Sequence, residues 1–158
     1  SLRTGITFGL TSAVITTLGL MVGLHAGTHS KMVVLSGILT IAIADAFSDA
    51  LGIHVSEEAE NVHTPAQVWI STIATFFAKF LFALTFAVPL ILFSLSTAII
   101  ISLFWGIGTL SALSYVMARA KGEAPWKVVG EHTLIAAVVI LLTHWLGDWI
   151  GTLGQLQQ

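Results

Sequence analysis

The sequence predicts an all-α, polytopic membrane protein with about five transmembrane helices. Hydrophobic residues make up 56% of the 158 residues and charged residues only 9%, whereas a typical soluble domain has about 25% charged residues. The mean hydropathy is +0.94. Apolar runs of roughly 20 residues, the length that spans a bilayer, follow one another along the chain. A soluble fold would leave large apolar patches in water.

These runs predict a single transmembrane domain over residues 1–158, with no separate soluble domain. The first run has no charge and is too long for the apolar core of a signal peptide, so we expect a retained helix. Polar or turn-forming segments separate the later runs. The predicted helices cover about residues 4–24, 32–55, 66–88, 89–117 and 128–153.

Pro89 lies between two apolar runs and has two interpretations. It either opens a fourth helix, since proline suits a first helical turn, or kinks one continuous element. The second interpretation gives four spans, but the length of this region favours five. The run that ends near Met117 is longer than one span requires, so we expect it to tilt, break or protrude.

Basic residues predict the orientation in the membrane. With five spans, Arg3, Arg119, Lys121 and Lys127 lie on one side, and Lys31 alone lies on the other. The positive-inside rule then places the N-terminus in the cytoplasm. We expect an integral protein of a prokaryotic plasma membrane.

Several classes of protein are excluded or disfavoured. The chain has no cysteine, which excludes disulfides and thiolate metal sites. The net charge of −2, without a basic tail, argues against a nucleic-acid partner. The chain has no phosphate-binding glycine loop, no GxSxG and no HExxH, so we do not expect an enzyme or a bound cofactor.

Glycines on the first predicted helix recur at four-residue spacing. The pairs are Gly5 and Gly9, Gly19 and Gly23, and Gly23 and Gly27. Such spacing lets two helix backbones approach closely. It predicts a contact of this helix with another helix or with a second copy in a homodimer, unless it only reflects the abundance of glycine in membrane helices.

Asp45 and Asp49 are the strongest functional signal. They lie four residues apart, on one face of the second helix. A charge in the bilayer core costs about 2.5–3.5 kcal/mol on insertion scales. Two carboxylates on one face therefore hold either a proton or a cation between them. Ser48 adds a possible oxygen ligand, and the alternative is a buried salt bridge that only fixes helix packing.

Lys79 lies inside the third predicted helix and needs a partner there. If the second and third helices are antiparallel, it approaches the aspartate pair. The contact is then either a static ion pair or a switch in which an incoming cation or proton displaces the ammonium. A third possibility is that the side chain extends to the membrane interface.

Histidines gather near the predicted outer side. His144 and Asp148 lie four residues apart among tryptophans, which favours a polar rim over a pair of metal ligands or a catalytic pair. His25 and His29 have the same spacing at the end of the first helix. A metal exit role for them is the less favoured interpretation.

The segment between the second and third helices groups carboxylates and imidazoles. It is predicted as an acidic cytoplasmic loop that collects metal ions or is merely solvated. Carboxylates and imidazoles together suit iron, manganese or zinc. The residues concerned are His54, Glu57, Glu58, Glu60 and His63.

Two stretches resemble the vacuolar iron transporter family. The run from Gly5 to Ala13, Gly-Ile-Thr-Phe-Gly-Leu-Thr-Ser-Ala, is similar to its first helix. The run from Ile43 to Gly52, Ile-Ala-Asp-Ala-Phe-Ser-Asp-Ala-Leu-Gly, is similar to its second helix. Pro89 and the segment from Lys121 to Trp126 look like later landmarks of the family. The chain resembles a divergent, prokaryotic-type member that lacks the large cytoplasmic metal-binding insertion.

The resemblance implies a five-helix homodimer that moves ferrous iron, and often manganese, in exchange for protons. The sequence departs from the family where the metal would bind. Phe8 stands in place of an aspartate, Ile41 in place of a carboxylate and Asp49 in place of a methionine. Replacing a thioether with a carboxylate shifts the preference toward harder ions, such as Mn²⁺, or toward protons.

Two functions follow as hypotheses. The first is a divalent-metal transporter, possibly a metal/proton antiporter. Asp45, Asp49, Ser48 and Thr11 would be ligands, and Lys79 would be a competing internal cation. The second is a non-transporting scaffold or interaction protein whose Asp–Lys pairs are structural.

Overall fold

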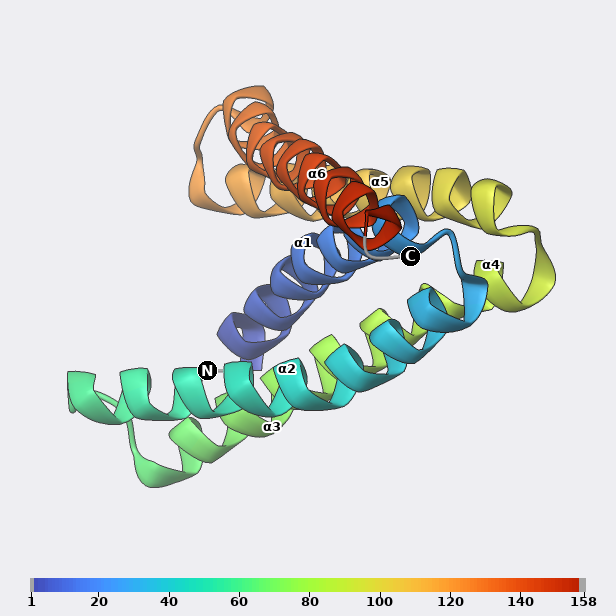
Figure 1. Cartoon of the computed structure of the whole chain (residues 1–158). Coiled ribbons are helices and arrows are strands. Elements are labelled where there is room, and N and C mark those ends of the chain that lie inside the picture. The colour runs from blue at the N-terminus through green and yellow to red at the C-terminus, as the bar shows by residue number, and fades with distance from the viewer. Residues whose placement is uncertain (1, 157–158) are drawn as a thin grey trace.

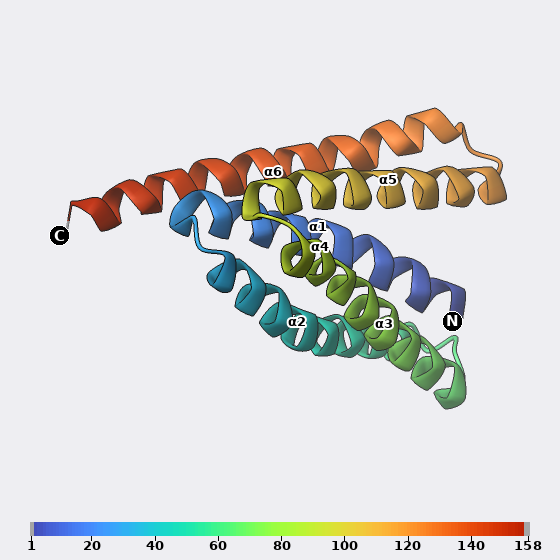
Figure 2. The same cartoon turned by 90° about the vertical axis from the view of Figure 1, so that its right-hand side faces the viewer.

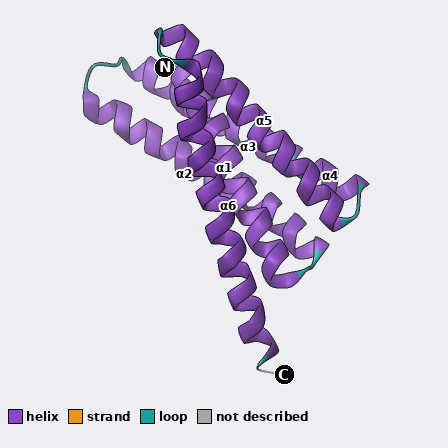
Figure 3. Ribbon diagram, turned by 90° about the horizontal axis from the view of Figure 1, so that it is seen from above, coloured by secondary structure: helices purple, strands orange, loops and turns teal. Residues whose placement is uncertain are grey.

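The computed structural model describes residues 2–156, and these residues form helices and no strand. Five stretches are long and apolar enough to cross a membrane, which confirms the predicted fold class. Figure 1 shows the helices in chain order, and Figure 3 shows that short loops connect them. The elements are α1 (Leu2–Thr28), α2 (Lys31–Glu60), α3 (Pro65–Thr85), α4 (Ala87–Leu92), α5 (Leu95–Lys121) and α6 (Pro125–Gln155).

Local sequence signals define most of the helix ends. Ser30 precedes α2 and accepts a hydrogen bond from the backbone N–H of Val33. Thr64 forms a reciprocal capping box with Gln67 at the start of α3, which satisfies two of the unpaired amides of the first turn. Asn61 and Gly122, with φ of 52° and 74°, end α2 and α5 in the left-handed conformation that favours asparagine and glycine.

The third span differs from the sequence expectation. Pro89 does not open a new span, because it lies in the first turn of the short helix α4, where its missing N–H costs little. The third span covers Pro65–Leu92. The chain breaks instead at Phe93 and Ser94, both extended, and the next span begins at Leu95. The Lys31 ammonium donates a 2.8 Å hydrogen bond to the Phe93 carbonyl, which satisfies one acceptor at this break.

α1 is the central helix of the bundle. It packs against α3 on one side and α6 on the other, and it also touches α2 and α5. Figures 1 and 2 show α5 and α6 on one side of it and α2 and α3 on the other. In the most apolar 18-residue stretch of α1, half of the residues are buried, whereas only 11% are buried in the corresponding stretch of α6. The helix without charge in its interior is therefore the one that the others surround.

The glycines of α1 make contacts within this chain. A side chain at Gly9 would meet the backbone of Thr75 on α3, and one at Gly27 would meet Gly147 on α6. Gly5 also faces α3, and Gly19 and Gly23 also face α6. The predicted contact of this helix with other helices is confirmed, because its glycines face α3 and α6.

Small side chains line the interior and large apolar ones cover the outside. Ala42, Ala46 and Ala50 of α2 are buried, while Phe47 and Leu51 of the same helix are more than 60% exposed. This arrangement is typical of membrane helices, in which small residues allow close packing and large ones meet lipid. The apolar core gathers near the C-terminal half of α1, around Leu18, Met21 and Ile38.

Candidate cation site between α1, α2 and α3

Lys79 of α3 forms an ion-paired triad with Asp45 and Asp49 of α2. Its Nζ lies 2.5 Å from one carboxylate oxygen of each aspartate, and its side chain is only 1% exposed. The contact with Asp49 is also a hydrogen bond. The Asp45 oxygen lies off the hydrogen-bonding direction and is buried without a hydrogen-bond partner in the described residues. Two carboxylates therefore face one buried ammonium.

α1 supplies the third wall of this triad. The Lys79 ammonium donates a 2.7 Å hydrogen bond to the Ser12 hydroxyl. A side chain at Gly9 would lie 3.2 Å from the Lys79 amide nitrogen, so the glycine allows the two backbones to approach. Ser12 lies on the same face of α1 as Gly5 and Gly9. That face was the sequence signal for Ser12, which was missing from the predicted ligands.

Two predicted ligands lie away from the triad contacts. The Thr11 hydroxyl donates a 2.9 Å hydrogen bond to the Thr7 carbonyl of its own helix turn. Ser48 is exposed on α2, between the two aspartates in sequence. Helix geometry separates neighbouring residues by about 100° around the axis, so Ser12 faces α3 and Thr11 does not.

The acidic segment after Val55 is not a loop, as we expected from the sequence. α2 continues through it to Glu60. Glu57 is 6% exposed and accepts a 2.7 Å hydrogen bond from the buried Ser71 hydroxyl of α3. Its second oxygen is buried without a partner in residues 2–156. Glu58 and Glu60 are exposed.

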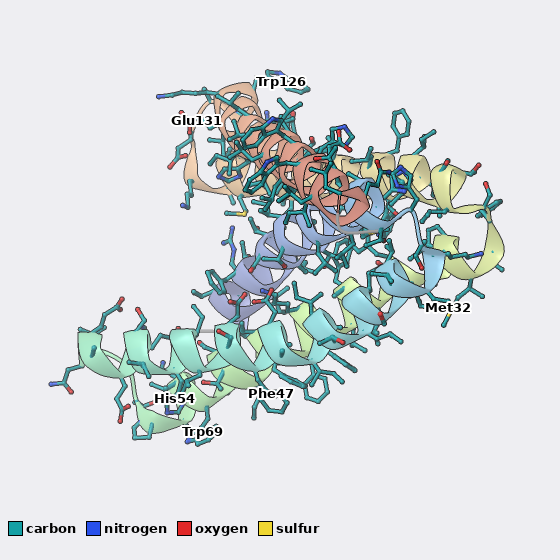
Figure 4. The ribbon with its side chains drawn as sticks, in the orientation of Figure 1. Met32, Phe47, His54, Trp69, Trp126 and Glu131 are labelled. Carbon is teal, nitrogen blue, oxygen red and sulfur yellow. The ribbon has the colours of Figure 1, made fainter. Side chains whose placement is uncertain are left out.

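The histidines of this end have separate partners. His54 Nδ1 lies 2.9 Å from the Thr72 hydroxyl, and its ring packs edge-on against Trp69. Figure 4 shows His54 and Trp69 together at one end of α2 and α3. His63 lies 3.5 Å from Glu60. In the described part of the chain, no three histidine or acidic side chains are grouped closely enough to hold a metal ion.

The opposite end of the bundle brings the predicted outer histidines onto neighbouring helices. The rings of His25 and His29 are 5.5 Å apart on α1. His144 Nε2 lies 3.3 Å from Asp148 on α6, and both side chains are more than half exposed. The glycine contacts between α1 and α6 place these two pairs on adjacent helices. The exposure of His144 and Asp148 fits the polar rim expected from the sequence.

The charges of the triad define what the site can do. With all three groups ionised, two carboxylates and one ammonium leave one net negative charge. The aspartate side chains are 22% and 17% exposed, so they are accessible from one side, whereas the lysine is enclosed. A second cation or a proton that reaches Asp45 would therefore compete directly with the ammonium for the same oxygens.

No family model, no curated protein and no solved structure matches this chain.

Proposed function

We propose that this protein is a membrane transporter that exchanges divalent metal ions for protons, and that the Asp45–Lys79–Asp49 triad is its ion site. The observation that carries the proposal is the buried ammonium held 2.5 Å from both carboxylates. Within the membrane-spanning part of the chain, two acidic side chains are already arranged around a cation. Ionisable residues at such positions typically mark ion pathways.

The ammonium of Lys79 acts as an internal substitute for the transported ion. A divalent ion on the aspartate pair would neutralise both carboxylates and leave Lys79 without a counter-charge. Lys79 would then release its proton to water or turn away from the site. In the first case, binding of metal is linked to release of a proton, which is the physical basis of exchange. When the metal leaves, the lysine regains a proton and closes the site again.

Iron or manganese as the transported ion is a further part of the proposal. Oxygen ligands from Asp45, Asp49 and Ser12 favour hard divalent ions. The similarity of the stretches around Gly9 and Asp45 to the vacuolar iron transporter family also favours a divalent metal over a monovalent one. The homodimer that this family implies belongs to the proposal as well.

The test is metal flux into proteoliposomes that contain purified protein. Asp49→Asn should abolish flux of Mn²⁺ and Fe²⁺, because it removes one of the two charges that hold the ion. Asp148→Asn makes the same chemical change in an exposed pair and should leave flux unchanged. Equal flux in wild type and Asp49→Asn would overturn the assignment of the site, and no flux in wild type would overturn transport itself.

A scaffold or interaction protein with a static ion pair is the second candidate. The observation that favours it is the environment of the Lys79 ammonium, which donates hydrogen bonds to Ser12 and Asp49 and forms an ion pair with Asp45. A double-mutant cycle with Lys79→Met and Asp45→Asn separates the candidates. Strongly destabilised single variants and a double variant as stable as wild type would support the static pair. If the triad is an ion site for transport, the double variant should fold but should not move metal ions into proteoliposomes.

A further inference from the structure

A second polar site lies beside α1, at the end of the bundle where the described chain begins. Its volume is about 560 Å³, within the range of about 300–1,000 Å³ typical of small-molecule sites. The start of α1, the end of α5 and the first turns of α6 form its walls. We call it the basic groove, and its polar side chains are Arg3, Thr4, Thr7, Thr11, Lys121 and His132.

The basic groove has positive charge without a counter-charge. No acidic side chain lines it. Among residues 2–156, no ion pair includes Arg3 or Lys121. On α6, Glu131 directly precedes His132, but it does not line the groove. Its carboxylate lies 4.0 Å from the Lys127 ammonium. An anion in the groove would therefore meet two cations that have no carboxylate partner.

His132 is held in place at the wall of the groove. Its Nδ1 lies 2.7 Å from the hydroxyl of Ser114, which is buried on α5. Because the Ser114 hydroxyl already donates to the Leu110 carbonyl, Nδ1 is the donor in this contact, which fixes the ring. The Thr4 and Thr7 hydroxyls on one side of α1 are donors for phosphate oxygens, whereas the Thr11 hydroxyl already donates to the Thr7 carbonyl.

The opposite side of α1 is a useful contrast. A groove of about 490 Å³ lies there at the same end of the helix, lined by Leu2, Ile6 and Leu10 and by apolar residues of α3. Lipid tails satisfy such an apolar groove. The basic side of the same helix instead favours a negatively charged occupant, because Arg3 and Lys121 both line it.

The basic groove also lies at the ends of the spanning helices, where lipid phosphates are expected. Arg3 is in the first turn of α1 and Lys121 in the last turn of α5. Trp126, at the start of α6, is 76% exposed and packs against Tyr115, and exposed aromatic residues of this kind are typical of the membrane–water interface. Figure 4 shows Trp126 and Glu131 at this end and Met32 at the other.

We propose that the basic groove binds the phosphate headgroup of an anionic phospholipid. Arg3 and Lys121 supply the charge, the Thr4 and Thr7 hydroxyls supply hydrogen-bond donors, and Phe8 and Met117 contact the upper part of an acyl chain. Basic pockets between transmembrane helices are a known means of recognising anionic headgroups. The inference does not depend on metal transport, because it uses none of the triad residues.

The test is lipid binding to purified protein, measured by native mass spectrometry with phosphatidylglycerol, phosphatidylcholine and inorganic phosphate. Wild type should bind one phosphatidylglycerol in preference to phosphatidylcholine. Arg3→Gln with Lys121→Gln should weaken that binding about 30-fold, since each basic residue near an anionic headgroup contributes about fivefold. Thr7→Val keeps the charge of the groove and should weaken lipid binding less than the double variant does. It replaces the double variant in the test if that variant does not fold.

The matched control is Arg119→Gln with Lys127→Gln. It removes the same charge from the same end of the bundle but leaves the groove lining intact. An equal loss of lipid binding in both double variants would mean a diffuse surface charge and would overturn the proposal. Equal binding of inorganic phosphate and lipid, or no preference for phosphatidylglycerol, would overturn it as well.

Discussion

Two pairs of residues with the same spacing have opposite environments in this protein. Asp45 and Asp49 on α2 face a buried lysine, whereas His144 and Asp148 on α6 are more than half exposed and pair mainly with each other. The spacing is identical, and both pairs lie on one side of an apolar helix. A spacing of four residues places two side chains on the same face of a helix. The neighbouring helix then decides whether that face is enclosed as a binding site or remains exposed as a polar rim.

The neighbouring helix also explains why only one pair is enclosed. α2 packs against both α1 and α3, and α3 presents the buried stripe Ser71, Thr75 and Lys79 at four-residue spacing. α6 packs along α1 through contacts at Gly147 and Gly151, and no helix of the described chain covers His144 and Asp148, which are more than half exposed. Substitutions at the two pairs should therefore differ by several kcal/mol in stability.

The largest expected effect is at Lys79. Lys79→Met removes the only ammonium within reach of Asp45 and Asp49 in the described residues. Breaking a buried ion pair on one side costs about 3–5 kcal/mol, because it leaves an uncompensated charge. Denaturant unfolding in detergent micelles should show this loss. Lys127→Met, in an exposed pair, is the control and should change stability by less than about 0.5 kcal/mol.

A smaller effect is expected at the backbone contact that positions Lys79. A Cβ on Gly9 would lie 2.8 Å from the Thr75 carbonyl oxygen and 3.0 Å from Ala78. Gly9→Ala should therefore push α1 away from α3 and lower the free energy of unfolding by about 1–3 kcal/mol.

Gly108→Ala on α5 is the matched control for Gly9→Ala, because no atom lies within 4 Å of its Cβ position. It should leave stability unchanged or raise it by up to about 1 kcal/mol, since alanine favours a helix over glycine. If both alanine variants behaved alike in thermal unfolding, close packing of α1 on α3 would not support the triad.

Ser71→Ala tests the buried glutamate at the end of the same seam. It removes the donor to Glu57, whose other oxygen already has no partner in the described chain. An unsatisfied buried acceptor costs about 1–3 kcal/mol, and we expect a value near the lower end because Glu57 is close to the helix end. Glu58→Gln, on the exposed neighbour, should change the unfolding midpoint little.

The smallest effect is expected at the exposed pair. His144→Gln removes a 3.3 Å contact with Asp148 in which both side chains are largely exposed. Exposed ion pairs contribute about 0–1 kcal/mol, so the unfolding free energy should change by less than about 0.5 kcal/mol. A loss of 2 kcal/mol or more would erase the contrast between the two pairs and point to a structural role at the α6 end.

Hydropathy predicted the number of spans well and their ends less well. Pro89 was the most visible signal in the third span, yet the break is four residues later, at Phe93 and Ser94. Proline is compatible with the first turn of a helix, so its presence does not fix on which side of it a helix begins. The acidic residues after Val55 suggested a loop, but α2 continues because glutamate and alanine favour helix.

The site was predictable in part for a related reason. Asp45, Asp49 and Lys79 stand out because charges are rare in membrane helices, and the antiparallel arrangement of α2 and α3 brings them together. Ser12 and Glu57 did not stand out in the same way. Serine is common in membrane helices, and a glutamate near a helix end reads as solvated until a partner such as Ser71 is known.

The sequence by itself determined that this chain forms five membrane-spanning helices and that a lysine and two aspartates must find partners inside them. Both conclusions follow from the cost of exposing apolar surface to water and charge to hydrocarbon. Only the tertiary structure decided which helix lies at the centre and which i, i+4 pair is enclosed. Those choices depend on how small residues of α1 allow α3 and α6 to approach, and close packing between distant segments is not encoded in local periodicity.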